Sequence, residues 1–422
     1  MKSIYLIYLL ISVLASCLST QKNVDAQYID APTDTIVTSN LKETQNSQAF
    51  GKKIVLGAER FAEYEAALNG KSVALVVNQT SMVGSTHLVD ILLSKGIHIK
   101  TVFAPEHGFR GKADAGAHVS DSKDAKTGLP IVSLYGKNKK PSKEQLENID
   151  VVVFDIQDVG ARFYTYISTM HYVMEACAEN DKKVLVLDRP NPNGHYVDGP
   201  VLDVKFQSFV GMHPIPIVHG MTVGELAQMI NAEAWLKDGL RCDLQVVPCL
   251  NYTHKMPYEL PIKPSPNLPN LRSIYLYPSL CLFEPTVVSI GRGTDKQFQL
   301  AGTPTKTDHA TFSFMPVSKA GAKYPKHENK TCYGIDFSTA SAETYRKNQL
   351  NLSWLIDFYN HANDKKGFFT SSDFFNKLAG NAILQQQIKV GLPESQIRQT
   401  WEAKLQIFKD KRKKYLLYTD FE

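Results

Sequence analysis

Four apolar runs in the first half of the chain each end in polar side chains that could bind or transform a ligand. Runs this rich in β-branched residues are typical of strands buried on both faces of a parallel sheet, and ligands bind beyond the carboxyl ends of such strands. A lone Asp at a strand end usually caps or faces solvent, but four ends carrying acids, arginines and amides predict a functional rim. The runs are SVALVVNQT (72–80), TVFAPEHGF (101–109), VVVFDIQDVGARFYTY (151–166) and VLVLDRPNPNG (184–194). The rim residues are Asn78, Glu106, His107, Asp155, Gln157, Asp158, Arg162, Asp188, Arg189 and Asn191.

The acids of this rim could carry acid–base catalysis. Glu106 stands between Pro105 and His107 at the mouth of a predicted strand, where a partly desolvated carboxyl group suits a general acid. Asp155 and Asp158 are three residues apart at the next strand end and could come within carboxylate-pair distance of Glu106. The alternative for Glu106 is a structural role, in which it accepts backbone N–H bonds of a tight turn.

Arg162 stands at the start of a predicted helix, where the helix dipole disfavours a cation. Its position therefore predicts either an anionic ligand or an Asp partner. Tyr164 and Tyr166 follow it and could stack on or hydrogen-bond a sugar.

Other catalytic chemistries find less support in the sequence. It contains no G-x-S-x-G elbow and no P-loop, and NQTSMVG stands where a dinucleotide-binding G-x-G-x-x-G would follow the first strand. His107, His195 and His219 could join Asp155 or Asp188 around a metal, but no H-E-x-x-H or H-x-H spacing supports this. We therefore expect no metal and no cofactor, and keep a metal-dependent hydrolase as a weaker alternative.

The N-terminus resembles a bacterial lipoprotein signal. Lys2 precedes an apolar stretch from Ile4 to Ala15, too short to span a bilayer, and the stretch closes with Leu14-Ala15-Ser16-Cys17. The pattern predicts a signal peptide over 1–17, lipidation of Cys17 and a flexible polar tether over 18–50. The protein would then be exported and membrane-anchored on the periplasmic or cell-surface side. The alternative is ordinary cleavage nearby, with Cys17 incidental.

The composition of the 422 residues is that of a globular protein, with 43% hydrophobic residues and a net charge of +5. The basic run KDKRKK (409–414) fits a solvated helix end. No basic stripe interleaved with aromatic residues indicates nucleic-acid binding. Beyond Cys17 the five cysteines lack C-x-x-C spacing, so we expect most of them to be buried as small apolar residues: Cys177, Cys242, Cys249, Cys281 and Cys332.

Predicted helices alternate with the apolar runs and indicate an α/β fold with a doubly wound, mostly parallel sheet. The candidates are 60–68, 87–95, 142–149, 163–179 and a helix opened by the Thr222/Glu225 capping box, and a further strand is expected at 244–247. The Pro-rich stretch 257–278 should break regular structure and lead to a second unit. The tail, 378–417, should be helical, with Trp401, Leu405 and Phe408 on one buried stripe.

Six segments, in this order, are similar to those of the exo-β-N-acetylmuramidase family, exo-lytic glycosidases of peptidoglycan recycling formerly known only as a domain of unknown function. They are FAPEHGF, VFDIQDVGARFYTY, LDRPNPNG, HGMTVGELA, PSPNLPN and LFE followed by SIGRGT. The resemblance runs from about residue 54 to the C-terminus. The chain departs from the family pattern at Ser81, where Gly is usual, and at 285–287, where Pro-Thr-Val replaces Gly-Thr-Asn.

The resemblance implies a Rossmann-like catalytic domain, which we place at 51–256, and a smaller α+β C-terminal domain at 257–422 that closes the cleft. It implies release of N-acetylmuramic acid from the non-reducing end of peptidoglycan fragments, with the glutamate of P-E-H-G, Glu106, as prime catalytic candidate. His107, Asp155 and Asp158 complete the catalytic candidates. The expected substrate-binding residues are Asn78, Gln157, Arg162, Tyr164, Arg189, Asn191, His219, Asn267, Glu284, Arg292 and Thr294.

The lactyl carboxylate of N-acetylmuramic acid calls for an arginine fork, for which Arg162, Arg189 and Arg292 are available. Arg162 is the first choice because of its position at a helix start, and Arg292, which stands between two glycines, is the second. The alternative function is a lipoprotein that binds a muropeptide or sugar acid without cleaving it. The acid-rich rim favours the enzyme, because a pure binder of an anionic sugar would not usually gather three acids beside it.

Overall fold

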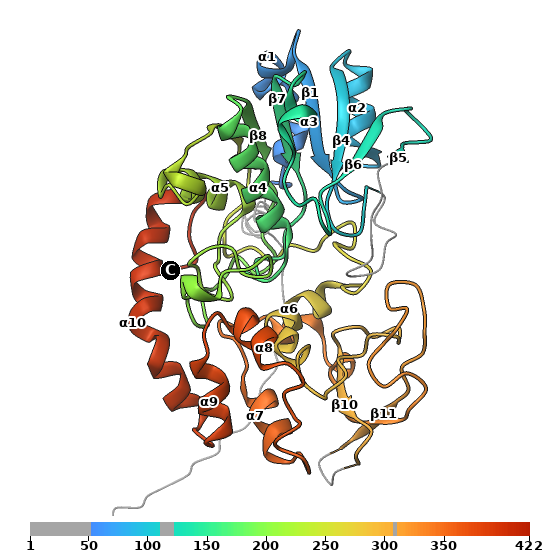
Figure 1. Ribbon diagram of the computed structural model, residues 1–422, viewed down its shortest axis with the longest axis vertical. Helices are drawn as coiled ribbons and strands as arrows, with labels where there is room; N and C mark the ends of the chain where they lie inside the picture. The colour runs from blue at the N-terminus through green and yellow to red at the C-terminus, as the bar shows by residue number, and fades with distance from the viewer. Residues whose placement is uncertain (1–51, 110–121, 307–309) are drawn as a thin grey trace, which may run out of the picture. The chain divides into compact units, whose positions relative to one another are not determined.

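The computed structural model describes residues 52–109, 122–306 and 310–422 (Figure 1). The predicted signal peptide, the lipidation site Cys17 and the tether lie outside these residues. Within the described ranges, no helix is both long enough and apolar enough to cross a membrane.

A seven-stranded sheet forms the N-terminal part, as the alternation of strands and helices predicted. All neighbouring strands are parallel except β5 and β6, which are antiparallel. The strand order is β5-β6-β4-β1-β7-β8-β9. The strands are β1 (Ser72–Val77), β4 (His98–Ala104), β5 (Ser122–Lys123), β6 (Pro130–Ser133), β7 (Val151–Asp155), β8 (Lys183–Leu187) and β9 (Asp243–Val247). β2 (Met82–Val83) and β3 (Thr86–His87) form a separate hairpin.

Both faces of the sheet are covered. In β7, Val152 and Phe154 belong to one apolar cluster, while Val151 and Val153 belong to another on the opposite face. The helices α4 (Tyr166–Glu179) and α5 (Val223–Ala232) pack on the first face, and α2 (Leu88–Ser94) packs on the second. Burial on both faces explains why the strands read as continuous apolar runs rather than as alternating patterns.

Two helices begin where their capping boxes predict. In α3 (Lys143–Leu146) and α5, the side chain of the N-cap residue, Ser142 or Thr222, accepts a hydrogen bond from the N3 backbone amide. The first predicted helix is reduced to the single turn of α1 (Glu65–Leu68), preceded by two short 3₁₀ segments.

The C-terminal part is a smaller α+β unit built on a three-stranded antiparallel sheet of order β10-β12-β11. Its strands are β10 (Leu300–Thr303), β11 (Phe312–Phe314) and β12 (Cys332–Asp336), and its helices are α6 (Leu271–Leu280), α7 (Ser353–Asn360), α8 (Ser372–Ala379), α9 (Ile383–Lys389) and α10 (Glu394–Arg412).

Two expectations for the C-terminal half were wrong in detail. The Pro-rich stretch does not stay irregular, because α6 begins after its Asn270 cap and continues through Pro278. The tail is mostly helical, as expected, but it is divided into separate helices: Gly380, with φ 79°, ends α8, and Pro393 stands at the N-cap of α10. The predicted stripe is confirmed for Trp401 and Phe408, which are buried.

The two parts share one apolar core. Residues of β7 and α4 belong to the same cluster as Phe283, Phe298 and Phe368 of the C-terminal part. α10 ends beside α5, where Lys411 forms an ion pair with Glu233 (Figure 1). The five cysteines described are buried and unbridged.

Candidate active site

The carboxyl ends of three central strands carry the polar clusters to one region. The chain runs outward from β1 to β4 and β6, then returns to β7 on the other side of β1. This reversal places the strand order change between β1 and β7, where open α/β sheets bind their ligands. Asn78 follows β1, Glu106 follows β4 and Gln157 follows β7.

A cavity of about 250 Å³ receives side chains from both parts of the chain. Ligand pockets commonly hold about 300–1,000 Å³, so this one suits a small ligand. Six of the predicted site residues line it: Glu106, His107, Tyr164, Asn267, Glu284 and Arg292. The other lining residues that matter below are Tyr135, Phe163, Thr165, Tyr166, Phe209, Val210, Leu268, Tyr277, Phe298 and Phe374.

Glu106 enters the cavity from the loop after β4. Its carboxyl group is half-buried, and the hydroxyl of Thr165 donates to its Oε2 at 2.8 Å. Thr165 is the N-cap residue of α4, so the helix fixes the donor. The next two residues, His107 and Gly108, have φ values of 69° and 75°, and this left-handed pair turns the chain sharply beside the cavity.

A second carboxylate reaches the cavity from the C-terminal part. Glu284 ends the short 3₁₀ helix η5 (Cys281–Phe283), and its Oε1 accepts hydrogen bonds from Nε and one Nη of Arg292, at 2.9 and 2.5 Å. Gly291 and Gly293, with φ values of 78° and 81°, let the loop bring Arg292 over the ring of Phe298. Glu284 and Arg292 therefore act as one ion-paired unit in the wall.

Lys326 supports this wall, although the sequence analysis did not predict it as a site residue. Its ammonium group donates to the carbonyls of Glu284 and Val288 at 3.0 Å and also contacts those of Phe283 and Thr286. Burial lowers its pKa to about 8. No motif marks it, because its partners are main-chain carbonyls some 40 residues earlier in the chain.

Tyrosine rings and an amide complete the polar lining. Tyr164 packs edge-on against Tyr166 and Tyr277, with ring centroids 4.9 and 5.8 Å apart. Burial raises the pKa of Tyr164 well above its ordinary value, so it remains a neutral phenol. Asn267 donates from Nδ2 to the carbonyl of Gly321 at 2.9 Å, a contact that orients its amide.

Asp155 and Arg189 do not line this cavity but hold each other. Both are almost fully buried, and Arg189 donates through Nε and Nη2 to the two carboxylate oxygens of Asp155 at 2.5 and 2.9 Å. Arg189 Nη2 also reaches the carbonyl of Met82. These contacts favour a structural role instead of the catalytic and substrate-binding roles predicted.

Asp158 and His219 also lie outside the lining. Both are buried, with Nε2 of His219 3.9 Å from Oδ2 of Asp158. Desolvation raises the pKa of Asp158 to about 7 and lowers that of His219 to about 3, so each tends toward its neutral form. Oδ2 of Asp158 accepts from the backbone amide of Gly160, which again points to a role in the turn after β7.

The contacts of Arg162, our first choice for binding the lactyl carboxylate, argue against that role. It is fully buried and donates to the carbonyls of Pro200, Ile215 and Leu378 at 2.7–2.8 Å. Gly380 lies so close that a Cβ there would stand 2.7 Å from Nη2. The Asp partner expected from its position is not among these described contacts, and the guanidinium instead ties α8 to the N-terminal part.

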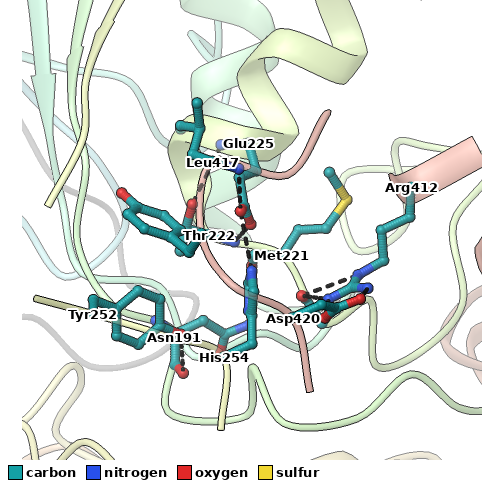
Figure 2. Close-up of polar contacts among 12 residues, drawn as sticks. Asn191, Met221, Thr222, Glu225, Tyr252, His254, Arg412, Leu417 and Asp420 are labelled. Carbon is teal, nitrogen blue, oxygen red and sulfur yellow. Dashed lines mark hydrogen bonds and ion pairs between the residues drawn. The ribbon is translucent and has the colours of Figure 1, made fainter. Parts of the chain in front are cut away.

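The four remaining predicted residues hold loops. Asn78 Oδ1 accepts from the backbone and hydroxyl of Thr80, and Gln157 Nε2 donates to the carbonyls of Asp158 and Pro190. Thr294 caps its own loop through the carbonyl of Gly291. Asn191 Nδ2 donates to the carbonyl of Met221 (Figure 2).

Figure 2 also shows a buried polar network beside Asn191, which includes the last residues of the chain. Glu225 Oε1 pairs with Nε2 of His254 at 3.0 Å and accepts the backbone amide of Leu417 at 2.8 Å. Arg412 forms a two-pronged pair with Asp420. The sequence favoured a capping-box role for Glu225, and the capping box is present, but the sequence did not predict the contacts with His254 and with Leu417.

A larger cavity, of about 320 Å³, lies within the C-terminal part and has mostly apolar walls that include Phe358 and Phe368. None of the predicted site residues lines it. The smaller cavity, with two acids and an arginine, is therefore the candidate active site.

Comparison with known proteins shows what this chain is similar to. Residues 73–272 match the N-terminal and residues 275–418 the C-terminal family model of the exo-β-N-acetylmuramidase NamZ. The chain is 39% identical over 403 residues to the peptidoglycan β-N-acetylmuramidase NamZ of Bacillus subtilis, covering 89% of this chain and 94% of that protein.

Two crystal structures of DUF1343 family proteins from Bacteroides fragilis are also similar. One has 48% sequence identity and a TM-score of 0.81 and matches 87% of this chain and 100% of its own. The other has 31% identity and a TM-score of 0.70 and matches 87% and 99%.

Proposed function

Because this chain belongs to the exo-β-N-acetylmuramidase family and is a glycoside hydrolase, we propose that it releases N-acetylmuramic acid from the non-reducing end of peptidoglycan fragments, with Glu106 as general acid. The observation that carries the proposal is a small cavity with two carboxyl groups, Glu106 and Glu284, contributed by the two parts of the chain.

The surroundings of the two acids suit different tasks. Glu284 accepts both of its described hydrogen bonds from Arg292 through one oxygen, so it acts as a carboxylate. Glu106 accepts a hydrogen bond from the Thr165 hydroxyl at one oxygen and stands in the P-E-H-G sequence that the family resemblance marks as the prime catalytic candidate, so we assign to it the proton donation to the leaving oxygen. The proton moves from Glu106 to the glycosidic oxygen as that bond breaks.

Glycosidases place a second negative group near the developing oxocarbenium ion. A 2-acetamido sugar can supply its own carbonyl oxygen as the nucleophile, and Glu284 then stabilises positive charge; without that assistance Glu284 itself serves as base or nucleophile. The cavity accommodates one sugar better than a polymer segment, which supports exo-action.

The proposal is tested with the purified protein on a chromogenic β-glycoside of N-acetylmuramic acid, with the N-acetylglucosamine analogue alongside. Turnover of the first and weak or no turnover of the second is expected. Tight binding of the muramic acid sugar without cleavage would instead favour the non-catalytic binding lipoprotein.

Arg292 takes the place of Arg162 as the residue that recognises the lactyl carboxylate, the group that distinguishes the two sugars. We expect Arg292→Lys to reduce selectivity for the muramic acid glycoside by about 2 kcal/mol, because lysine keeps the charge but loses the planar fork. The measurement is kcat/KM for both glycosides. Arg272→Lys is the matched control, since Arg272 is partly buried and lies outside the cavity lining. Equal losses on both sugars in Arg292→Lys would show that Arg292 does not recognise the lactyl group.

We also propose that Cys17 is acylated and anchors the protein to a membrane on the periplasmic or cell-surface side. The support is the sequence Leu14-Ala15-Ser16-Cys17 after a short apolar stretch. Cys17→Ala is expected to move the protein from the membrane fraction to the soluble fraction. A wild-type protein already soluble after lysis, with no acyl mass on its N-terminal peptide, would contradict the anchor.

A further inference from the structure

The burial of the cavity lining is graded. Phe163, Leu268 and Phe298 are at most 3% exposed and form a closed floor. Tyr135, Phe209, Val210 and Phe374 are only partly buried, and Phe374 is 37% exposed. The partly exposed side chains therefore mark the mouth of the cavity.

Three aromatic side chains, which we call the aromatic rim, gather at this place: Tyr135 and Phe209 line the cavity, and Tyr172 packs against Phe209. Tyr135 follows β6, Tyr172 lies on α4 and Phe209 lies in the loop before α5. The ring centroid of Phe209 is 6.2 Å from that of Tyr135 and 6.3 Å from that of Tyr172. The rings of Phe209 and Tyr172 are nearly parallel, with an angle of 15° between their planes. Lys139 Nζ stands 4.6 Å from the Phe209 centroid. These contacts hold Phe209 in place from two segments, the loop after β6 and the helix α4.

A fixed, partly exposed aromatic ring at a cavity mouth is suited to contact with the apolar face of a sugar. Large apolar side chains left in water mark binding surfaces when they gather beside a pocket. Aromatic rings supply much contact area at little cost in side-chain entropy, and they line ligand sites for this reason.

We propose that Tyr135 and Phe209 form the subsite for the leaving sugar, the 2-acetamido sugar whose oxygen receives the proton from Glu106. The inference rests on the proposed function and deepens it. The closed floor admits only the terminal sugar, so the remainder of the substrate must pass through the mouth, where Tyr135 and Phe209 stand. The aromatic rim thus recognises what the terminal sugar is attached to, while Arg292 recognises the terminal sugar itself.

The test uses two substrates that share the terminal sugar and differ in the leaving group. One is the disaccharide N-acetylmuramyl-β-1,4-N-acetylglucosamine, and the other is the methyl β-glycoside of N-acetylmuramic acid, whose leaving group is too small to reach the rim. In Phe209→Ala and in Tyr135→Ala, kcat/KM for the disaccharide should fall about tenfold, mostly through KM. For the methyl glycoside it should stay within about twofold of wild type. Phe209→Tyr, which keeps the ring, should retain wild-type behaviour.

Tyr324→Ala is the matched control, because Tyr324 is 82% exposed and does not line the cavity. If Phe209→Ala fails to fold, Phe209→Leu keeps apolar volume without the ring and carries the test. An equal fall in kcat/KM on both substrates, or no fall on either, would overturn the subsite. If the wild-type protein still turns over these substrates, the proposed function would stand. Absence of wild-type turnover on both substrates would refute the proposed function, and the subsite with it.

Discussion

Glu106→Gln is expected to abolish glycosidic cleavage and leave the fold intact. The amide has the shape of the acid but cannot supply its proton, and loss of a general acid costs about 10²–10⁴-fold in rate. The fold should survive because Glu106 is half-buried and the Thr165 hydroxyl can still donate to the amide oxygen. The measurement is kcat on the muramic acid glycoside, together with the thermal unfolding midpoint.

Glu63→Gln provides the control for the same chemical change at a site away from the cavity, since Glu63 is exposed, forms an ion pair with Arg60 and does not line the cavity. That variant should match wild type in both measurements. A folded Glu106→Gln protein with near-wild-type kcat would remove Glu106 from the mechanism and leave Glu284 as the acid to examine.

The second large effect concerns the buried pair of Asp155 and Arg189. Arg189→Leu would leave the fully buried Asp155 carboxylate without the guanidinium group that donates two hydrogen bonds to it. Breaking such a pair costs about 3–5 kcal/mol, because the remaining charge stays out of water. We therefore expect a fall of this size in the free energy of unfolding, measured by urea denaturation.

The exposed pair Lys377–Asp373 is the control, and Lys377→Met should cost less than about 1 kcal/mol. The double variant Arg189→Leu with Asp155→Leu, which removes both charges, should recover part of the stability lost by Arg189→Leu. If Arg189→Leu has normal stability but no activity, the pair would have a catalytic or substrate-binding role, and the structural role would be contradicted.

The sheet could be predicted because burial on two faces leaves a direct signal. Each of the runs ending at Asn78, Glu106 and Gln157 belongs to a strand whose polar end meets the others at the order change between β1 and β7. A short strand such as β6 escaped prediction because Pro130–Ser133 is too brief to show a pattern.

The sequence could place residues at a rim but could not tell which of them face the cavity. Arg162, Arg189 and Arg292 look equivalent as available forks, yet their partners differ. Arg162 donates to carbonyls as far away as that of Leu378, whereas Arg189 and Arg292 pair with carboxylates. Contacts between residues separated by many positions depend on how the two parts pack. The same reason hid Lys326 and the aromatic rim, which no local motif marks.

The tail contacts at Glu225 have a consequence for how the protein is synthesised. Leu417 and Tyr418 supply hydrogen bonds to Glu225 and Asp188, two buried acids beside the ends of β8 and α5. The residues of the whole sheet are synthesised well before Leu417 and Tyr418, so until these two are added each acid lacks one of its hydrogen-bond partners. We therefore expect the N-terminal part to stay loosely packed during translation and to become protease-resistant only after residues 417 and 418 have been made and have folded onto it.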